Sequence, residues 1–143
     1  MFKNIFLTGL VATVFGTLIS LAYFMLFKYS PLQLDFTEKA SFVNLFAFNM
    51  FIGMAACFLY FILHSIIKKE TIASFVFGLL LSGSAISIAL LFLFKVDKDL
   101  VFKDENAELY KDFYYFIYAI VTFFPVLSWF TFKPLFIKLK WKT

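Results

Sequence analysis

The chain has 143 residues, of which 63% are hydrophobic, 23% aromatic and 15% charged, and its formal net charge is +4. Soluble domains contain about 25% charged residues, and a chain of this length forms at most one domain. Four runs without Asp, Glu, Lys or Arg cover residues 4–27, 40–67, 71–94 and 113–132. A bilayer core about 30 Å thick is crossed by about 20 helical residues, and too little polar chain remains to cover four such helices in water. The composition therefore excludes a soluble protein. It predicts an all-α membrane protein, a four-helix transmembrane bundle that forms one domain over residues 1–143.

The distribution of charge predicts the topology. All thirteen basic residues are lysines, and seven of them lie at the N-terminus, between the second and third runs, and at the C-terminus, opposed only by Glu70. The other two loops contain six lysines and eight acidic residues. Because basic loops stay in the cytoplasm, we expect both termini and the short second loop to be cytoplasmic. The positive charge is then a feature of topology and of contact with an anionic inner leaflet of the bilayer, and we expect no nucleic-acid partner.

The first predicted helix starts close to the first residue. Its uncharged run is longer than the apolar region of a signal peptide, which is about 7–15 residues, and no small-x-small cleavage site follows, so we expect a retained helix. Small residues recur every three or four positions, at Gly9, Thr13, Gly16, Thr17 and Ser20. Small faces let membrane helices approach closely, so this row is predicted to be a packing surface.

Asp35 and Glu38 have the spacing of a capping box, which favours a start of the second predicted helix near Phe36. Only the stretch KKE at 68–70 separates this helix from the third. Such a short connection predicts that the two helices are antiparallel neighbours.

Polar and small side chains form a row along the second predicted helix, at Asn49, Gly53, Cys57, Tyr60 and His64. Polar groups within the bilayer face protein or water, so the row is predicted to point into the bundle. As a functional site, His64 would be a pH-sensitive group near the cytoplasmic mouth, and Asn49 and Tyr60 would line a pocket. As a packing seam, the same side chains would make interhelical hydrogen bonds. We favour the packing seam, because the other helices carry comparable small rows without a titratable group.

The third predicted helix carries a second small row, at Ser74, Gly78, Ser82, Ala85 and Ala89. Like the row on the first helix, it is predicted to pack against a neighbouring helix.

The fourth predicted helix contains Pro125, which cannot donate a hydrogen bond to the carbonyl of Val121 and therefore predicts a kink. The tyrosines at its outer end are expected in the interfacial aromatic belt. They are Tyr110, Tyr114, Tyr115 and Tyr118.

The C-terminal tail alternates lysines with apolar residues and is expected to lie on the inner leaflet. Each lysine there contributes about 1 kcal/mol against anionic lipid. The residues predicted to contact the lipid surface are Lys138, Lys140, Trp141 and Lys142.

The residue types present exclude most membrane enzymes. The only cysteine, Cys57, rules out a thiol oxidoreductase with paired cysteines, and the only histidine, His64, rules out paired axial haem ligands within one chain. No Asp or Glu lies within a predicted span, which argues against carboxylate-coupled transport, intramembrane hydrolysis and a metal cage. We therefore expect no catalytic residues, no metal and no cofactor.

Two stretches, NIFLTGLVATVFGTLISLAYF near the start and FFPVLSWFTFKPLF near the end, carry a resemblance to a known group. They resemble the first and last spans of small four-span bacterial membrane proteins of unknown function. The shared features are a Thr-Gly opening and a Phe-Phe-Pro…Lys-Pro ending. The resemblance implies a location in the bacterial inner (cytoplasmic) membrane and no particular chemistry.

Three functions are compatible with these patterns. We favour a small non-enzymatic membrane protein that acts as an accessory or assembly subunit through helix–helix contacts, with a membrane-protein partner or as a homo-oligomer. The alternative is a small oligomeric transporter or channel, whose path would follow the polar row on the second helix and Pro125. A third is a lipid- or quinone-binding membrane enzyme that uses Tyr60 and His64. A water-filled cavity that reaches Asn49 would favour transport, and a closed core would favour the accessory subunit.

Overall fold

A computed structural model describes residues 2–29, 41–95 and 119–137, and the structural statements below refer to these ranges. In them the chain forms four helices that are long and apolar enough to cross a membrane, which confirms the predicted all-helical fold class. A helical turn at 119–121 precedes the last helix. The helices are α1 (Phe2–Lys28), α2 (Phe42–Ile66), α3 (Glu70–Lys95) and α5 (Phe124–Phe136).

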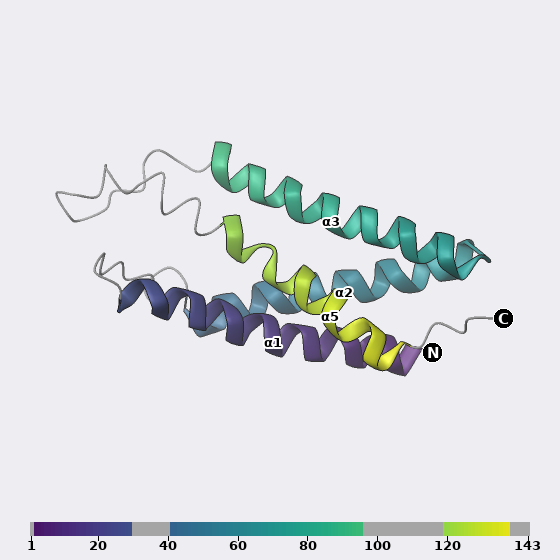
Figure 1. Cartoon of the computed structure of the whole chain (residues 1–143), viewed down its shortest axis with the longest axis horizontal. Helices are drawn as coiled ribbons and strands as arrows, with labels where there is room; N and C mark the ends of the chain where they lie inside the picture. Colours follow the sequence, from purple (N-terminus) through teal and green to yellow (C-terminus); the bar gives the residue numbers. More distant parts are fainter. Residues whose placement is uncertain (1, 30–40, 96–118, 138–143) are drawn as a thin grey trace.

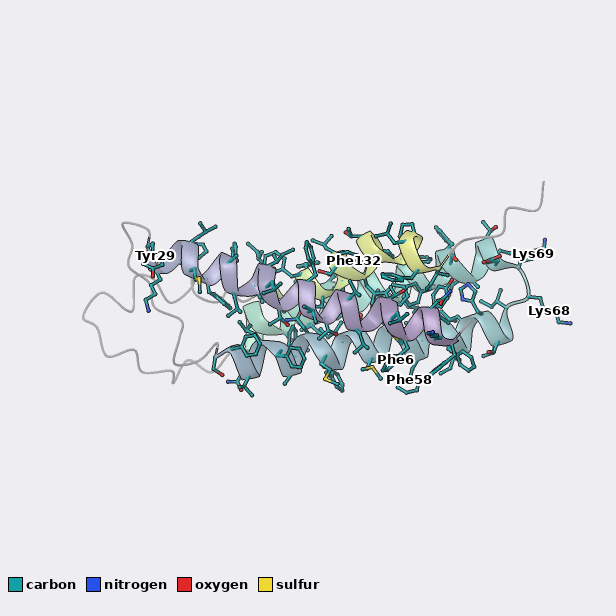
Figure 2. The ribbon with its side chains drawn as sticks, turned by 90° about the horizontal axis from the view of Figure 1, so that it is seen from below. Phe6, Tyr29, Phe58, Lys68, Lys69 and Phe132 are labelled. Carbon is teal, nitrogen blue, oxygen red and sulfur yellow. The ribbon has the colours of Figure 1, made fainter. Side chains whose placement is uncertain are left out.

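Consecutive helices run in opposite directions, as predicted (Figure 1). The start of α1, the turn Ile67–Lys69 and the end of α5 lie together at one end of the bundle, which we call the turn end. Figure 2 shows Lys68 and Lys69 at this end and Tyr29 at the other. The beginning and the end of the described chain therefore lie on the same side of the bundle. That this side is cytoplasmic stays a prediction from the lysines.

The helices α1, α2 and α5 pack against one another, and α3 packs mainly on α2. In Figure 1, α3 lies along one edge of the bundle. Only 22% of the membrane-spanning part of α3 is buried inside the protein, against 44% for α1. The fold is thus a three-helix core with a fourth helix on its edge.

The first turn of α2 is fixed by a serine. Ser41 has an extended backbone, with φ −62° and ψ 154°, and its hydroxyl accepts a hydrogen bond of 3.3 Å from the Asn44 amide. This is the geometry of an N-cap, so α2 begins at Phe42 and the predicted start near Phe36 is wrong. The capping box of Asp35 and Glu38 lies outside the described residues.

The surface of the bundle is apolar and its interior contains the polar side chains. Large hydrophobic residues are strongly exposed on all four helices, including Leu26 (70%), Phe51 (75%), Phe75 (67%) and Leu135 (67%). The buried polar residues are Thr8, Thr13, Thr17, Ser20, Asn49, Thr122 and Ser128. Exposed apolar surface on this scale is incompatible with water, and polar groups inside a bilayer face protein. The distribution is that of a membrane protein.

Candidate functional site

The row on α2 divides into two parts with different surroundings. Asn49, Gly53 and Cys57 face α1 and form the first part, the α1–α2 seam. Tyr60 and His64 lie one to two turns further along α2. Tyr60 contacts Phe77 of α3 and Trp129 of α5 instead, and His64 stacks on Tyr60. The two parts are described in turn, because they differ in packing and in the state of their polar atoms.

Glycines bring α1 and α2 into close contact in the seam. A Cβ atom added at Gly53 would lie 2.6 Å from the Thr13 hydroxyl oxygen and 3.0 Å from the Gly9 carbonyl oxygen. A Cβ atom added at Gly9 would overlap the Cys57 sulfur and lie 3.2 Å from the Gly53 carbonyl oxygen. Neither position has room for a larger residue, because the opposing atoms include backbone. This is the close approach that small residues permit between membrane helices.

The third close contact of the seam involves Asn49. A Cβ atom added at Gly16 would lie 2.6 Å from the Asn49 Oδ1 atom and 3.4 Å from the Pro125 Cα atom. Asn49 is fully buried, and its amide nitrogen donates a 2.8 Å hydrogen bond to the Leu45 carbonyl on its own helix. Its Oδ1 atom has no hydrogen-bond partner. The side chain therefore packs in the seam without joining the two helices by a strong hydrogen bond.

The hydroxyl groups of α1 bond mainly to their own helix. Thr13 donates to the Gly9 carbonyl at 2.8 Å, Thr17 to the Thr13 carbonyl at 2.8 Å, and Ser20 to the Gly16 carbonyl at 2.7 Å. The Thr13 hydroxyl is also 3.4 Å from the Asn49 carbonyl oxygen. Bonds to the carbonyl four residues back satisfy a hydroxyl within its own helix. The small row of α1 is thus buried at a helix contact, with its polar groups satisfied internally.

Cys57 joins three helices of the core. Its thiol donates to the Ile5 carbonyl of α1 at 3.2 Å. The indole nitrogen of Trp129, on α5, lies next to the same sulfur but outside hydrogen-bond geometry. Cys57 and Trp129 are 5% and 0% exposed. The thiol is a small buried core group in a tight three-helix junction.

Tyr60 belongs to an aromatic cluster at the turn end of the bundle. The cluster consists of Tyr60, Phe77 and Trp129, one residue from each of α2, α3 and α5, all fully buried. The ring centroids are 5.1 Å apart for Tyr60 and Phe77, 5.6 Å for Tyr60 and Trp129, and 4.9 Å for Phe77 and Trp129. Aromatic pairs at these separations stabilise a core beyond their burial alone. In the cluster, α3 contacts both α2 and α5.

His64 stacks on this cluster. Its ring lies 3.9 Å from the Tyr60 ring, with an interplanar angle of 27°. The Nδ1 atom is 3.0 Å from the Tyr60 carbonyl oxygen, to which it donates when it carries the proton. The Nε2 atom is buried and has no partner. His64 is therefore held in one orientation by its own helix, with its second nitrogen unpaired.

Lys133 is the charged residue of the cluster, and the sequence patterns did not indicate it. Its ammonium lies 5.1 Å from the Tyr60 ring centroid and 5.6 Å from that of Phe77. Both distances are in the range of cation–π interactions. One sequence pattern could have indicated Lys133. Trp129 and Lys133 are four residues apart on α5, as Tyr60 and His64 are on α2, so each helix has an aromatic residue followed one turn later by a basic one.

Two hydroxyl oxygens at the turn end lack hydrogen-bond partners. The Tyr60 hydroxyl and the Ser74 hydroxyl are buried and unpaired by hydrogen-bond geometry, although the two groups are neighbours. An unsatisfied buried donor or acceptor costs about 1–3 kcal/mol. The expectation of a protein hydrogen-bond partner is therefore not met for Tyr60. It is met for Asn49 by the bond of its amide nitrogen to the Leu45 carbonyl, although that bond is within α2 and the Oδ1 atom has no partner.

The small row predicted on α3 is buried at two of its five positions, Ala85 and Ala89, and is half-buried at the other three. Buried positions on α3 follow every fourth residue, at Ala73, Phe77, Leu81, Ala85 and Ala89. Ser74, Gly78 and Ser82 lie on the neighbouring row and are half-buried. A Cβ atom at Gly78 would meet only the Phe130 ring, at 3.8 Å. This is ordinary contact, so Gly78 does not serve a close helix approach.

The helix of the fourth span is interrupted just before Pro125. Thr122 and Phe123 donate their amides three residues back, to the Ala119 and Ile120 carbonyls at 3.2 and 3.0 Å. Pro125 is buried, has no N–H to offer Val121, and lies at the contact with Gly16. The predicted lipid-surface residues Lys138, Lys140, Trp141 and Lys142 lie outside the described residues, as do the tyrosines predicted at the outer end.

The fold and the two parts of the row define a class of protein, a small integral membrane protein with four membrane-spanning helices. Within the described ranges, no group of three His, Cys, Asp or Glu side chains is placed to hold a metal ion. No family model, curated protein or solved structure matches the chain.

Proposed function

We propose that the protein is a non-enzymatic accessory or assembly subunit that binds a transmembrane helix of another membrane protein through α3. The observation that carries this proposal is the low burial of α3, 22% of its span, in a protein whose α2 and α5 spans are each 39% buried. A helix that is attached along one narrow row leaves most of its surface for other contacts. The three-helix core is then the part that holds α3 in the membrane.

The exposed surface of α3 includes a face suited to another helix. We call it the Gly83 face. It consists of the exposed residues Leu80, Gly83, Ser84, Ser87 and Leu91. Nothing lies within 4 Å of a Cβ atom added at Gly83. Because small residues allow two membrane helices to approach closely, this face supports the proposal.

The serines of the Gly83 face are already satisfied. Ser84 donates to the Leu81 carbonyl and Ser87 to the Gly83 carbonyl, both at 2.8 Å. A second helix can therefore cover the face without leaving a polar group unpaired, which would otherwise oppose packing in lipid.

The structure of the α1–α2 seam argues against a transport path along α2. The seam is filled where Gly9, Gly53 and Thr13 meet, with distances too short for even one added methyl group. A path from Asn49 to His64 would have to cross this contact. We further propose that both termini are cytoplasmic, which the lysine distribution and the common position of the start of α1 and the end of α5 support. The bacterial inner membrane is proposed on the resemblance of the first and last spans.

Photo-crosslinking in native membranes tests the proposed function. A photoreactive amino acid at Leu80, on the Gly83 face, is compared with one at Phe58, an equally apolar and exposed position on α2 (49% and 56% exposed). We expect a protein adduct of one defined mass from position 80 only. The substitution Gly83→Leu should abolish it without lowering the stability of the bundle, because no atom of the chain opposes the new side chain.

Two other results have clear meanings. An adduct of twice the mass of the chain would show that the partner is a second copy of this protein, and thus that the protein forms a homo-oligomer. Lipid adducts alone at both positions would contradict the proposed function.

A further inference from the structure

We infer that the turn end of the bundle contains an acid-sensitive latch, in which the Lys133 ammonium lies over the Tyr60 ring while His64 is neutral and leaves it when His64 is protonated. The latch concerns the attachment of α5 to α2. It is therefore independent of the helix partner proposed for the Gly83 face of α3.

His64 and Lys133 share one aromatic ring. The His64 ring stacks on the Tyr60 ring with the centroids 3.9 Å apart, and the Lys133 ammonium is 5.1 Å from the same Tyr60 centroid. The charge distribution of an aromatic ring attracts a cation, which holds Lys133 in place. A proton on His64 would bring a second positive charge to this ring, and like charges repel more strongly where water is excluded. The position of Lys133 thus depends on a neutral His64.

The hydrogen bonds of His64 determine which nitrogen would take the proton. The Nδ1 atom is 3.0 Å from the Tyr60 carbonyl oxygen. A carbonyl oxygen only accepts, so the neutral ring carries its hydrogen on Nδ1 and an added proton binds to Nε2. The Nε2 atom is buried and has no partner. Protonation would therefore create a charged donor without an acceptor, which is costly in a buried place.

Charged groups on both neighbouring helices act on His64. Lys133 of α5 repels a proton on the imidazole, whereas Glu70, the first residue of α3, attracts it, and Lys133 acts more strongly than Glu70 does. The other described lysines at this end, Lys3 of α1 and the pair Lys68 and Lys69 in the turn, have exposed side chains. Their charges are screened by water and salt. The balance at His64 is therefore decided by Lys133 and Glu70.

Lys133 can relieve the repulsion by a local movement. It lies three residues before the end of α5, and lysines near the ends of membrane helices can extend their ammonium groups to the headgroups or to water. His64 has no such freedom, because its backbone hydrogen bond and its stacking on Tyr60 fix the ring. Acid should therefore move Lys133 away from Tyr60 and Phe77, which removes one contact between α5 and the other two helices of the cluster.

Nuclear magnetic resonance of the full chain in detergent micelles, with carbon-13 at the lysine Cε atoms, tests the latch. At about pH 8 the ring currents of Tyr60 and Phe77 should shift the Lys133 signal upfield of the signals of exposed lysines, and its absence in Lys133→Met identifies it. As the pH falls, we expect this signal to move to the position of exposed lysines, with a midpoint between about pH 5 and 7, where imidazoles titrate. In His64→Gln, whose amide can still donate to the Tyr60 carbonyl, the signal should keep its shift.

Glu70→Gln is a second variant, and it leaves both groups of the latch in place. Without the attraction of the carboxylate for the proton, the midpoint should fall by about half a pH unit. A Lys133 signal that lacks the upfield shift, or that keeps it in the wild type down to about pH 5, would overturn the latch. Equal movement of the signal in His64→Gln, or loss of the transition in Glu70→Gln, would assign the transition to another group and would overturn it as well.

Discussion

The substitution Gly53→Ala tests the central contact of the fold. The added methyl group would lie 3.0 Å from the Gly9 carbonyl oxygen and 2.6 Å from the Thr13 hydroxyl oxygen. The first atom is backbone and cannot move alone. The second is held by hydrogen bonds to the Gly9 and Asn49 carbonyls, at 2.8 and 3.4 Å. Relief therefore requires α1 and α2 to separate by several tenths of an ångström along the seam.

The magnitude follows from two opposing effects. Overpacking a well-packed contact costs about 1–3 kcal/mol, and replacing a helical glycine by alanine contributes up to about 1 kcal/mol in favour of the helix. We expect a net loss of about 1–2 kcal/mol in the free energy of unfolding. Reversible unfolding by SDS in mixed micelles, followed by circular dichroism, measures this quantity.

The chain offers a matched control in Gly83→Ala. Gly83 is also in a helix interior, but nothing lies within 4 Å of its added Cβ atom, so only the helix-propensity gain remains and stability should stay level or rise. Thr13→Ala combined with Gly53→Ala removes one of the two close contacts and should recover part of the loss, a coupling expected only for touching residues. Equal unfolding free energies for Gly53→Ala and Gly83→Ala would refute the close approach of α1 and α2.

Three further predictions concern the seam and the topology. Asn49→Leu should change the unfolding free energy by less than about 1 kcal/mol, because the amide bonds only to its own helix and the unpaired oxygen is lost; a loss above about 2 kcal/mol would show a hidden interhelical partner. Cys57 is the only cysteine and is 5% exposed. Its thiol should resist N-ethylmaleimide in the folded protein and react after unfolding in SDS. In the folded state, the reaction should be faster in Gly53→Ala than in the parent. In a Cys57→Ala variant, a thiol placed at Asp104 should react with an impermeant reagent from outside, and one at Thr143 only after permeabilisation. Labelling of both from the same side would contradict the topology.

The spans and the α1 row could be predicted from the sequence because they depend on short-range patterns. Uncharged runs of about 20 residues report membrane helices directly. In α1 the small residues are also the only row that allows close approach, so Gly9 and Gly16 lie at the contact. The start of α2 was misplaced because Ser41, a single N-cap, determines it, and the pattern of Asp35 and Glu38 looked equally favourable.

The orientation of α3 could not be predicted, because two adjacent rows compete for the interior. The row of Ser74, Gly78 and Ser82 is small, and the row of Ala73, Phe77 and Leu81 is mixed in size. The mixed row is buried because Phe77 fills the space beside Tyr60 and Trp129. Which row faces inward therefore depends on side chains of two other helices, and packing overrides the local pattern.

The aromatic cluster with Lys133 could not be predicted for a similar reason. Lys133 follows directly after the last uncharged run, and on the sequence alone it counts as one more basic residue at the membrane surface. Only the arrangement of α2, α3 and α5 places its ammonium over the Tyr60 and Phe77 rings. The row on α2 was interpreted as one continuous feature. In the structure it is divided after Cys57, because the residues before this point pack on α1 and Tyr60 packs on α3 and α5.

Three glycines are required by the packing of the bundle, whereas Gly83 is not. A glycine inside a helix costs about 1 kcal/mol relative to alanine. At Gly9, Gly16 and Gly53 the short distances to the opposing helix offset this cost, because no larger residue fits. At Gly83 there is open space and the bundle gains nothing from the missing side chain. A contact outside the chain would give Gly83 the role that α1 and α2 give the other three, and for this reason the Gly83 face is where we expect the partner helix.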